Sequence, residues 1–108
     1  MMLITNKLEI EEKEIIPGFK GRFIHTKNLT VVHWSISAGA ILQEHSHSHE
    51  QVTNLIEGEF EFDLDGEVTK LTAGGVVAIP SDVKHSAKAI TDCYVVDVFY
   101  PVREDYKK

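Results

Sequence analysis

The segment QVTNLIEGEFEFDLDGEVTKL, residues 51–71, consists of short runs rich in β-forming side chains that are separated by two glycines, Gly58 and Gly66. In its middle part, Phe60, Phe62 and Leu64 fall on one face and acidic side chains fall on the other. A period of two residues is typical of a β-strand with one buried face. The pair Asp65-Gly66 is a strong signal for a two-residue hairpin turn. The segment therefore predicts three consecutive strands, at residues 51–57, 59–65 and 67–71.

Similar short runs continue on both sides of this segment, and no long apolar stripe at the helical period occurs from Leu29 onward. The run 29–36 alternates in the same way, with Trp34 and His33 on opposite faces. Compact turn signals separate the runs. Strands that are this short and evenly spaced are typical of an all-β barrel or sandwich. Further strands are predicted at residues 29–36, 76–79, 84–90 and 93–100.

The domain organisation follows from length and pattern. With 108 residues, the chain suits one compact domain and is too short for two of ordinary size. We expect residues 29–100 to form the barrel. Residues 1–25 are polar and alternate only weakly, so we expect them to form a peripheral strand or arm.

Composition limits the possible partners and locations. Hydrophobic residues make up 43% of the chain and charged residues 26%, with a formal net charge of -6, which is ordinary for a globular protein. The few Lys and Arg residues are dispersed, so neither nucleic acid nor a membrane is an expected partner. The N-terminus lacks a secretory pattern, and no stretch has transmembrane length. One cysteine, Cys93, excludes an internal disulfide and fits a cytoplasmic location.

Histidines are concentrated in one short segment, QEHSHSHEQ, residues 43–51, which carries His45, His47 and His49. His85 follows later, at a turn that leads into a strand. Alternate positions of an extended segment point two imidazoles the same way, and a third from a neighbouring strand completes a cation site. The alternative is a solvated polar loop whose histidines have no role.

The spacing of these residues resembles the two motifs of the cupin family. The first runs from Gly39 through His45-Ser46-His47 and Gln51 to Gly58, and the second runs from Gly74 through Pro80 to His85. The resemblance implies a cupin jelly-roll barrel, a double-stranded β-helix, that encloses one divalent metal ion. It also implies that the ligands are His45, His47, Gln51 and His85. Zinc, nickel, iron, manganese and cobalt all accept such donors, so the metal's identity stays open.

Two departures from the family pattern bear on the chemistry. Gln51 stands where many cupins have glutamate, and Asp82 and Ala89 replace the usual glycine and asparagine of the second motif. A neutral amide leaves the charge of the ion uncompensated and favours Lewis-acid behaviour. The set of two histidines and one carboxylate that is typical of non-haem iron oxygenases is absent, which makes dioxygenase chemistry less favoured.

The remaining histidines receive weaker predictions. We expect His49 in the loop between the ligand-bearing strands, where it is a candidate for contact with metal or substrate. His33 is a candidate for the cavity wall, and His25 has no assigned role. Trp34, on the face opposite to His33, is predicted to be a core residue or a dimer contact.

The C-terminal segment carries further candidates. Asp97 interrupts an apolar strand, and a buried carboxylate must be hydrogen-bonded, paired or placed in a polar cavity. Its parity places Phe99 on the same face. An aspartate in the cavity can act as a general acid or base, whereas the alternative is a structural pair with Arg103 or a lysine. Arg103 offers a planar fork suited to a carboxylate, whereas its alternative is a salt bridge with Glu104 or Asp105.

This C-terminal segment resembles that of cupins of the KdgF type, a pectin-degradation family that acts on unsaturated uronates. The resemblance implies an enzyme that opens a 4,5-unsaturated galacturonate-type ring to the linear keto form, with a sugar acid as substrate. It assigns proton transfer to Asp97, the substrate carboxylate to Arg103 and pocket shape to Phe99. Open alternatives are another metal-dependent enzyme (an isomerase, lyase or dioxygenase) and a noncatalytic binding cupin.

The pattern of the strand predicted at residues 93–100 also indicates that two copies of the chain associate. Tyr94, Val96, Val98 and Tyr100 form an apolar face opposite to Asp97 and Phe99. A single layer leaves such a face uncovered. We therefore expect a homodimer.

Overall fold

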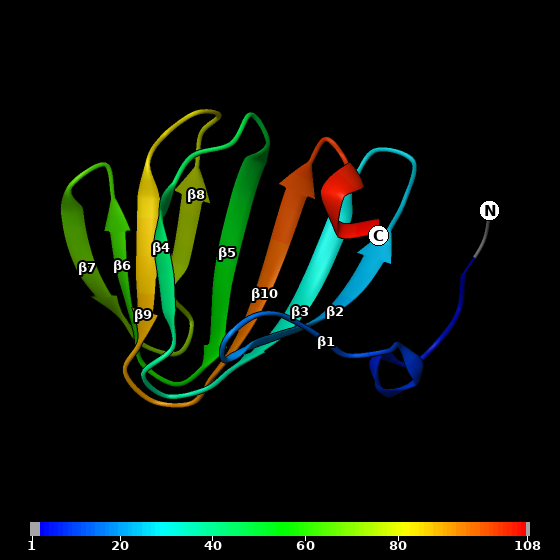
Figure 1. Cartoon of the computed structure of the whole chain (residues 1–108), viewed down its shortest axis with the longest axis horizontal. Coiled ribbons are helices and arrows are strands. Elements are labelled where there is room, and N and C mark those ends of the chain that lie inside the picture. Colours follow the sequence, from blue (N-terminus) through cyan, green and yellow to red (C-terminus); the bar gives the residue numbers. More distant parts are fainter. Residues whose placement is uncertain (1–2, 108) are drawn as a thin grey trace.

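The computed structural model describes residues 3–107, which form ten strands in two sheets that face each other (Figure 1). All strand pairs are antiparallel. The larger sheet has the order β1 (Lys13–Ile16), β2 (Phe19–His25), β3 (Thr30–Ile36), β10 (Cys93–Tyr100), β5 (Glu50–Glu57) and β8 (Val76–Ile79). The smaller sheet has the order β4 (Ile41–His45), β9 (His85–Ala89), β6 (Phe60–Leu64) and β7 (Glu67–Leu71). The all-β prediction is confirmed.

The core lies between the inner faces of the two sheets. Alternate residues of each central strand point inward, as the period of two predicts. In β6, Phe60 and Phe62 are buried while Glu61 is exposed. β10 repeats the pattern, with every second residue from Cys93 to Phe99 buried. The two sheets therefore cover each other's apolar faces, which is the arrangement that stabilises a β-sandwich.

The hairpin predicted at Asp65-Gly66 joins β6 to β7. Asp65 has φ 49° and Gly66 has φ 89°, so both central residues are left-handed. A type I′ turn requires this conformation at both positions. The turn aligns Leu64 opposite Glu67 and thereby sets the register of the hairpin.

The N-terminal segment contributes more to the sheet than an arm does. β1 is an edge strand, but β2 pairs with β3 from Phe19↔Ile36 to His25↔Thr30, and Phe19 is buried in the core. A short 3-10 helix, η1 (Lys7–Glu9), precedes β1. Of the segment 1–25, β1 thus lies at the edge of the larger sheet and β2 lies inside it, while residues 1–2 lie outside the described range.

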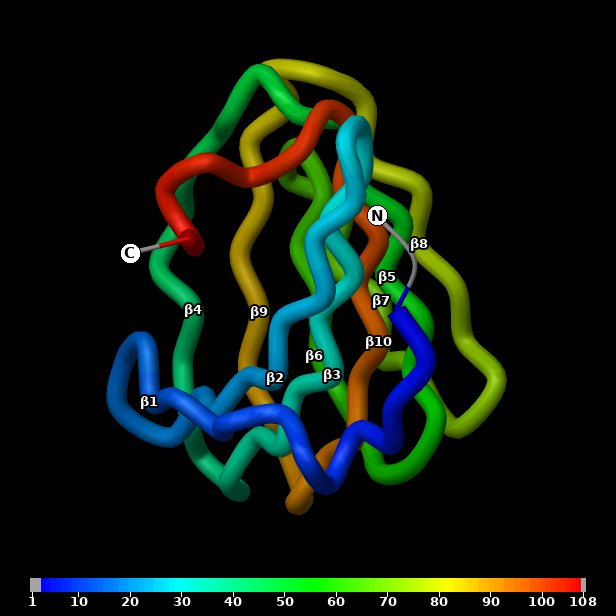
Figure 2. Tube along the Cα trace, turned by 90° about the vertical axis from the view of Figure 1, so that its right-hand side faces the viewer, coloured from blue at the N-terminus to red at the C-terminus, as the bar shows by residue number. Residues whose placement is uncertain are grey.

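The N-terminal hairpin and the C-terminal segment lie on the same side of the molecule. Figure 2 looks onto this side and shows the β1 hairpin (blue) in the lower half and the C-terminal segment (red) in the upper half. That segment ends in a second 3-10 helix, η2 (Glu104–Lys107). Among residues 3–107, no helix has the length and apolar character needed to cross a bilayer.

Candidate metal centre

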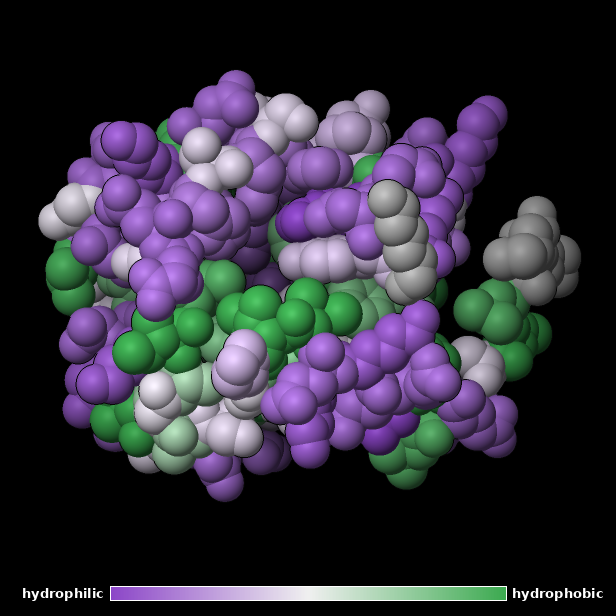
Figure 3. Space-filling model, viewed as in Figure 1, coloured by the Kyte–Doolittle hydropathy of each residue, from purple (hydrophilic) through white to green (hydrophobic). Residues whose placement is uncertain are grey.

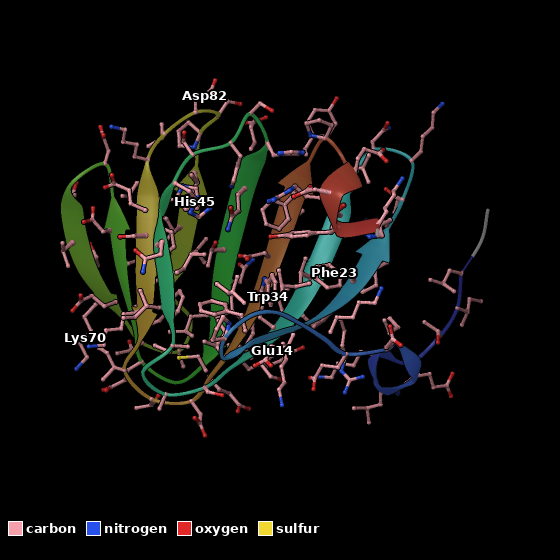
Figure 4. All side chains as sticks on the ribbon, viewed as in Figure 1. Glu14, Phe23, Trp34, His45, Lys70 and Asp82 are labelled. Atoms are coloured by element: carbon pink, nitrogen blue, oxygen red, sulfur yellow. The ribbon has the colours of Figure 1, made fainter. Side chains whose placement is uncertain are left out.

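Three histidines from different elements meet at one end of the space between the sheets. His45 ends β4, His85 begins β9, and the two face each other as Cα partners in the smaller sheet. His47 follows in the loop that leads to β5. The ligand nitrogens of the three residues all lie within 4.8 Å of one another, so they could hold a metal ion. Figure 4 labels His45 on the strand that borders this space.

Each of the three rings is anchored through its Nδ1 atom to a backbone carbonyl two residues away. The Nδ1–H groups of His45, His47 and His85 donate to the carbonyl oxygens of Gln43, His49 and Val83 at 2.8, 2.9 and 3.0 Å. A carbonyl only accepts, so Nδ1 carries the proton and Nε2 of the neutral ring is left with its lone pair. Burial lowers the pKa of His47 and of His85, which favours the neutral form that binds metals.

The Nε2 atom of His85 is the clearest sign that a ligand belongs here. His85 is 1% exposed, and its Nε2 has no hydrogen-bond partner among the described residues. A buried polar atom without a partner is destabilising unless something else satisfies it. A metal ion at the point where the three rings meet would do so.

Gln51 adds an oxygen donor to this cluster. It is buried on β5, and its Oε1 lies 3.0 Å from Nε2 of His47. Since the proton of His47 is on Nδ1, this approach brings together two acceptors, which repel unless a cation lies beside them. Two adjacent ligands with metal bonds of about 2.1 Å stand about 3 Å apart. Three imidazole nitrogens and one amide oxygen thus fit a divalent ion.

The second motif's departure from the family pattern has a structural basis. Asp82 stands where glycine is usual and has φ 64°, a left-handed conformation that glycine adopts without strain and aspartate tolerates. Its backbone N–H donates to the carbonyl oxygen of His47 at 2.8 Å. The loop before β9 is therefore tied directly to the loop that carries His47.

A cavity of about 100 Å³ extends from the histidines into the space between the sheets. Figure 3 shows a hollow on this face, with hydrophilic residues above it and a hydrophobic band below. Polar side chains meet in one part of the wall, and apolar side chains from both sheets and from β1 form the rest. The polar wall consists of His45, His47, Gln51, Thr53, Asp97 and Arg103.

Asp97 is the acidic group of the cavity. It is 7% exposed, and the indole Nε1–H of Trp34 donates to its Oδ2 at 2.9 Å. Its Oδ1 has no hydrogen-bond partner in the part of the chain that the structure describes. Burial raises the pKa of Asp97 from 3.8 to about 6, against the opposing effect of Thr53, Gln51 and Trp34 beside it. The carboxyl group can therefore gain and lose a proton near neutral pH.

Arg103 also lines the cavity, but part of its fork is already engaged. Its Nε and Nη2 donate to the two carboxylate oxygens of Asp105 at 3.0 and 2.8 Å. Its guanidinium carbon lies 4.7 Å from the ring centre of Phe99 and 4.2 Å from that of Tyr106. Between the two alternatives for Arg103, the structure shows both a cavity position and a salt bridge, and the partner is Asp105.

The other histidines lie in different surroundings. His49 lies in the loop with its ring centre 5.7 Å from that of His47, and its buried Nδ1 has no partner among residues 3–107. His33 faces outward and hydrogen-bonds to the hydroxyl of Tyr94, so its placement in the cavity wall is wrong. The side chain of His25 is bonded to Thr30 at 2.9 Å.

Among the cavity-wall residues that carry a polar group in the side chain, three were not predicted from the sequence as site residues: Trp34, Thr53 and Tyr106. The alternation of β3 already places Trp34 on the inward face with Val32, which is the cross-strand partner of Asp97. Thr53 is the partner of Asp97 on the other side. The sequence does not reveal that β10 pairs with β3 and β5 in this register, because alternation alone does not say which strands are neighbours. The contacts of Trp34 and Thr53 with the site could therefore not be predicted.

Comparison with known proteins agrees with the fold and with the cupin resemblance. The family model described as "Cupin domain" matches residues 32–99, which include all the candidate ligands. A curated but uncharacterised protein of Streptomyces coelicolor is 27% identical over 81 residues, covering 74% of this chain and 77% of its own. The prediction of a cupin jelly roll is thereby confirmed.

Two solved structures are similar over nearly their whole length. An RmlC-like cupin from Shewanella frigidimarina is 32% identical with a TM-score of 0.93, covering 98% of this chain and 96% of its own. KdgF from Halomonas sp. is 29% identical with a TM-score of 0.92, covering 98% of this chain and 99% of its own.

Proposed function

The chain belongs to the cupin family, and on this premise we propose that it is a metal-dependent enzyme that opens 4,5-unsaturated uronate rings of the galacturonate type. The product would be the linear keto form. The observation that carries the proposal is the free Oδ1 of Asp97 in the cavity that is also lined by His45, His47 and Gln51. The similarity to KdgF over nearly the whole chain supports the substrate class.

Four residues would hold the ion: His45, His47, Gln51 and His85. When bound there, a divalent ion supplies Lewis acidity toward oxygen atoms of the substrate. The neutral amide of Gln51 leaves that acidity undiminished by a protein charge. Zinc, nickel, iron, manganese and cobalt all remain candidates.

Asp97 would move the proton. Its Oδ1 takes the proton from the anomeric hydroxyl while the bond from C1 to the ring oxygen breaks, which leaves an aldehyde at C1 and an enolate at C5. The same carboxyl group then returns the proton to C4, which completes the ketone at C5 without any net change in composition. A pKa of about 6 suits a group that must both accept and donate a proton near neutral pH.

Arg103 would bind the carboxylate of the uronate. Asp105 takes the Nε and Nη2 donors, so the proposal assigns the substrate carboxylate to Nη1. Phe99 lies in the cavity wall under the guanidinium group and would shape the pocket beside the sugar ring.

The competing functions differ from this proposal in what they require of Asp97 and Arg103. A noncatalytic binding cupin has no need of a buried carboxylate with a free oxygen beside the metal ligands, because leaving that oxygen unsatisfied is destabilising. Both residues line the cavity, which supports an enzyme. Another metal-dependent isomerase, lyase or dioxygenase would use the same residues on a different substrate.

We further propose that the protein is cytoplasmic and works as a homodimer through the outer face of β10. Tyr100 is 53% exposed there, and Val52 of the neighbouring strand is 39% exposed. Burying such side chains against a second copy would stabilise a dimer. Light scattering of the native protein and of Tyr100→Glu tests this, since the variant should be monomeric, and a native monomer would contradict it.

The decisive experiment is the turnover of 4,5-unsaturated galacturonate, followed by the loss of its ultraviolet absorbance. Metal-loaded protein is compared with chelated protein and with Asp97→Ala. We expect decay well above the spontaneous rate only in the metal-loaded native protein. Decay no faster than in buffer, with bound metal verified, would refute the uronate function.

A further inference from the structure

Trp34 is the only tryptophan of the chain, and its indole group points from β3 into the cavity. The Nε1–H of Trp34 makes a 2.9 Å hydrogen bond with Oδ2 of Asp97. Both side chains are buried, at 6% and 7% exposure. A buried indole N–H needs an acceptor, and here the acceptor is the one carboxylate of the cavity.

The indole ring itself is held from several sides. The rings of Phe19, Phe23 and Tyr106 contact it in edge-to-face geometry, with centroid distances of 6.0, 5.6 and 6.2 Å. On the neighbouring strand, Gly21 is its cross-strand partner. A Cβ atom at Gly21 would lie 2.8 Å from Cζ3 of the indole, so the ring occupies the space that only glycine leaves free. Figure 4 shows Trp34 and Phe23 in this region.

The two oxygens of Asp97 therefore have different surroundings. Oδ2 is engaged by a donor whose own position is fixed, whereas Oδ1 is buried and has no partner among the described residues. A carboxylate with no fixed partner would rotate about its Cβ–Cγ bond and present either oxygen. With Oδ2 held, rotation is restricted and Oδ1 keeps its direction.

We propose that Trp34 is the positioning residue of Asp97, and that its indole N–H holds Oδ2 so that Oδ1 alone is presented to the substrate. The proposal rests on the function assigned above, in which Asp97 transfers the proton. Trp34 acts through Asp97 and belongs to the polar apparatus of the site as well as to the core. Phe23 packs on the same indole but does not line the cavity, so it supports the ring without belonging to the polar apparatus.

The kinetic test compares Trp34→Phe with Phe23→Leu. Trp34→Phe keeps an aromatic ring and removes the N–H, so we expect kcat to fall about tenfold to hundredfold, as for the loss of a hydrogen bond to a charged group. KM and the bound metal content should stay within about twofold. Phe23→Leu loosens the packing of the indole but keeps its N–H, so we expect a clearly smaller fall in kcat than in Trp34→Phe, at a comparable loss of melting temperature. An unchanged kcat in Trp34→Phe, or equal losses in both variants, would overturn the proposal.

A second measurement is independent of any activity. The single indole ¹H–¹⁵N resonance of the labelled protein belongs to Trp34 and reports its hydrogen bond. In Asp97→Ala, we expect this resonance to move upfield and the indole N–H proton to exchange faster with solvent. A resonance that does not move means that the pair does not exist in solution. If the native protein fails to turn over the uronate, the function above fails, and this resonance still decides whether Trp34 holds Asp97.

Discussion

Two groups of polar side chains share the cavity, and they are held in different ways. The metal cluster, defined as His45, His47, Gln51 and His85, has its imidazoles fixed by carbonyl oxygens two residues away along the chain. The acid cluster, defined as Asp97, Trp34 and Thr53, is assembled from three neighbouring strands, β10, β3 and β5. The imidazoles of the metal cluster are therefore held by their own chain segments, whereas the side chains of the acid cluster are held by the packing of the larger sheet.

This difference predicts how each cluster responds to change. Support from the local backbone survives small movements between strands, because ligand and anchor move together. Support across strands is lost when one strand shifts or when one bulky side chain is displaced. Metal binding should therefore tolerate changes in β2 and β3 that impair proton transfer.

The largest effect should come from removing a ligand of the metal cluster. In His85→Ala, the site loses its most buried nitrogen, and we expect metal affinity to fall by more than about 100-fold, with activity lost in proportion. Calorimetric titration with zinc, together with metal analysis of the purified protein, measures the change. His33→Ala is the matched control, because His33 lies on the outer face and should bind metal as the native protein does. Native-like affinity in His85→Ala would remove His85 from the ligand set.

In the metal-free protein, the buried carboxyl group of Asp97 should lower the stability of the fold at neutral pH. The pKa of Asp97 is raised by burial from 3.8 to about 6, so the folded state prefers the protonated form. Relative to a neutral side chain, stability is then lost as the pH rises from about 4 to about 6, and is unaffected below that range. A shift of about two pKa units corresponds to about 3 kcal/mol. Asp97→Asn should thus be more stable than the native protein by up to about 3 kcal/mol at pH 7.5.

Urea unfolding of chelated native protein and Asp97→Asn at pH 3.5 and pH 7.5 measures this difference. The advantage of the variant should be absent at the lower pH. An equal difference at both values would show that Asp97 does not titrate between them in the folded protein.

The contrast between local support and support across strands also explains which features of the fold and the site could be predicted from the sequence. Alternation, the Asp65-Gly66 turn and the spacing of the histidines are local patterns, so they predicted β3, the strands from β5 to β10 and the grouping of His45, His47 and His85 from the sequence alone. The register that brings Trp34 and Thr53 to Asp97 is a property of the whole sheet, which no local pattern encodes. The strand β2 was underestimated for a related reason, because its alternation is weak and its place depends on pairing with β3.

Irregular segments also limited what could be predicted about the direction of side chains. Beyond β10 there is no period from which to infer the direction of a side chain. The sequence therefore offered Arg103 several acidic partners, and only the structure identifies Asp105.

A change in β2 should separate the two clusters. In Gly21→Ala, the new Cβ would lie 2.8 Å from the buried indole and 2.9 Å from Cζ of the half-buried Phe23, and the two rings pack against each other. We expect a loss of about 1–3 kcal/mol in stability, as for overpacking, together with a lower kcat. Zinc affinity should stay within about twofold. Lys20→Ala, on the exposed face of the same strand, is the control. Equal loss of metal binding and of kcat would contradict the separate support of the two clusters.

The smallest effect should come from Asp105, which supports a residue of the cavity by a local contact. Its side chain is 57% exposed, and an exposed partner contributes at most about 1 kcal/mol to a salt bridge. The rings of Phe99 and Tyr106 would still hold the guanidinium group in Asp105→Asn. We expect KM for the uronate to rise about twofold to fivefold with kcat unchanged, measured by steady-state kinetics. A fall in KM would mean the opposite role: Asp105 would then occupy Arg103 in competition with the substrate carboxylate, and the pair would be an inhibitory contact within the cavity.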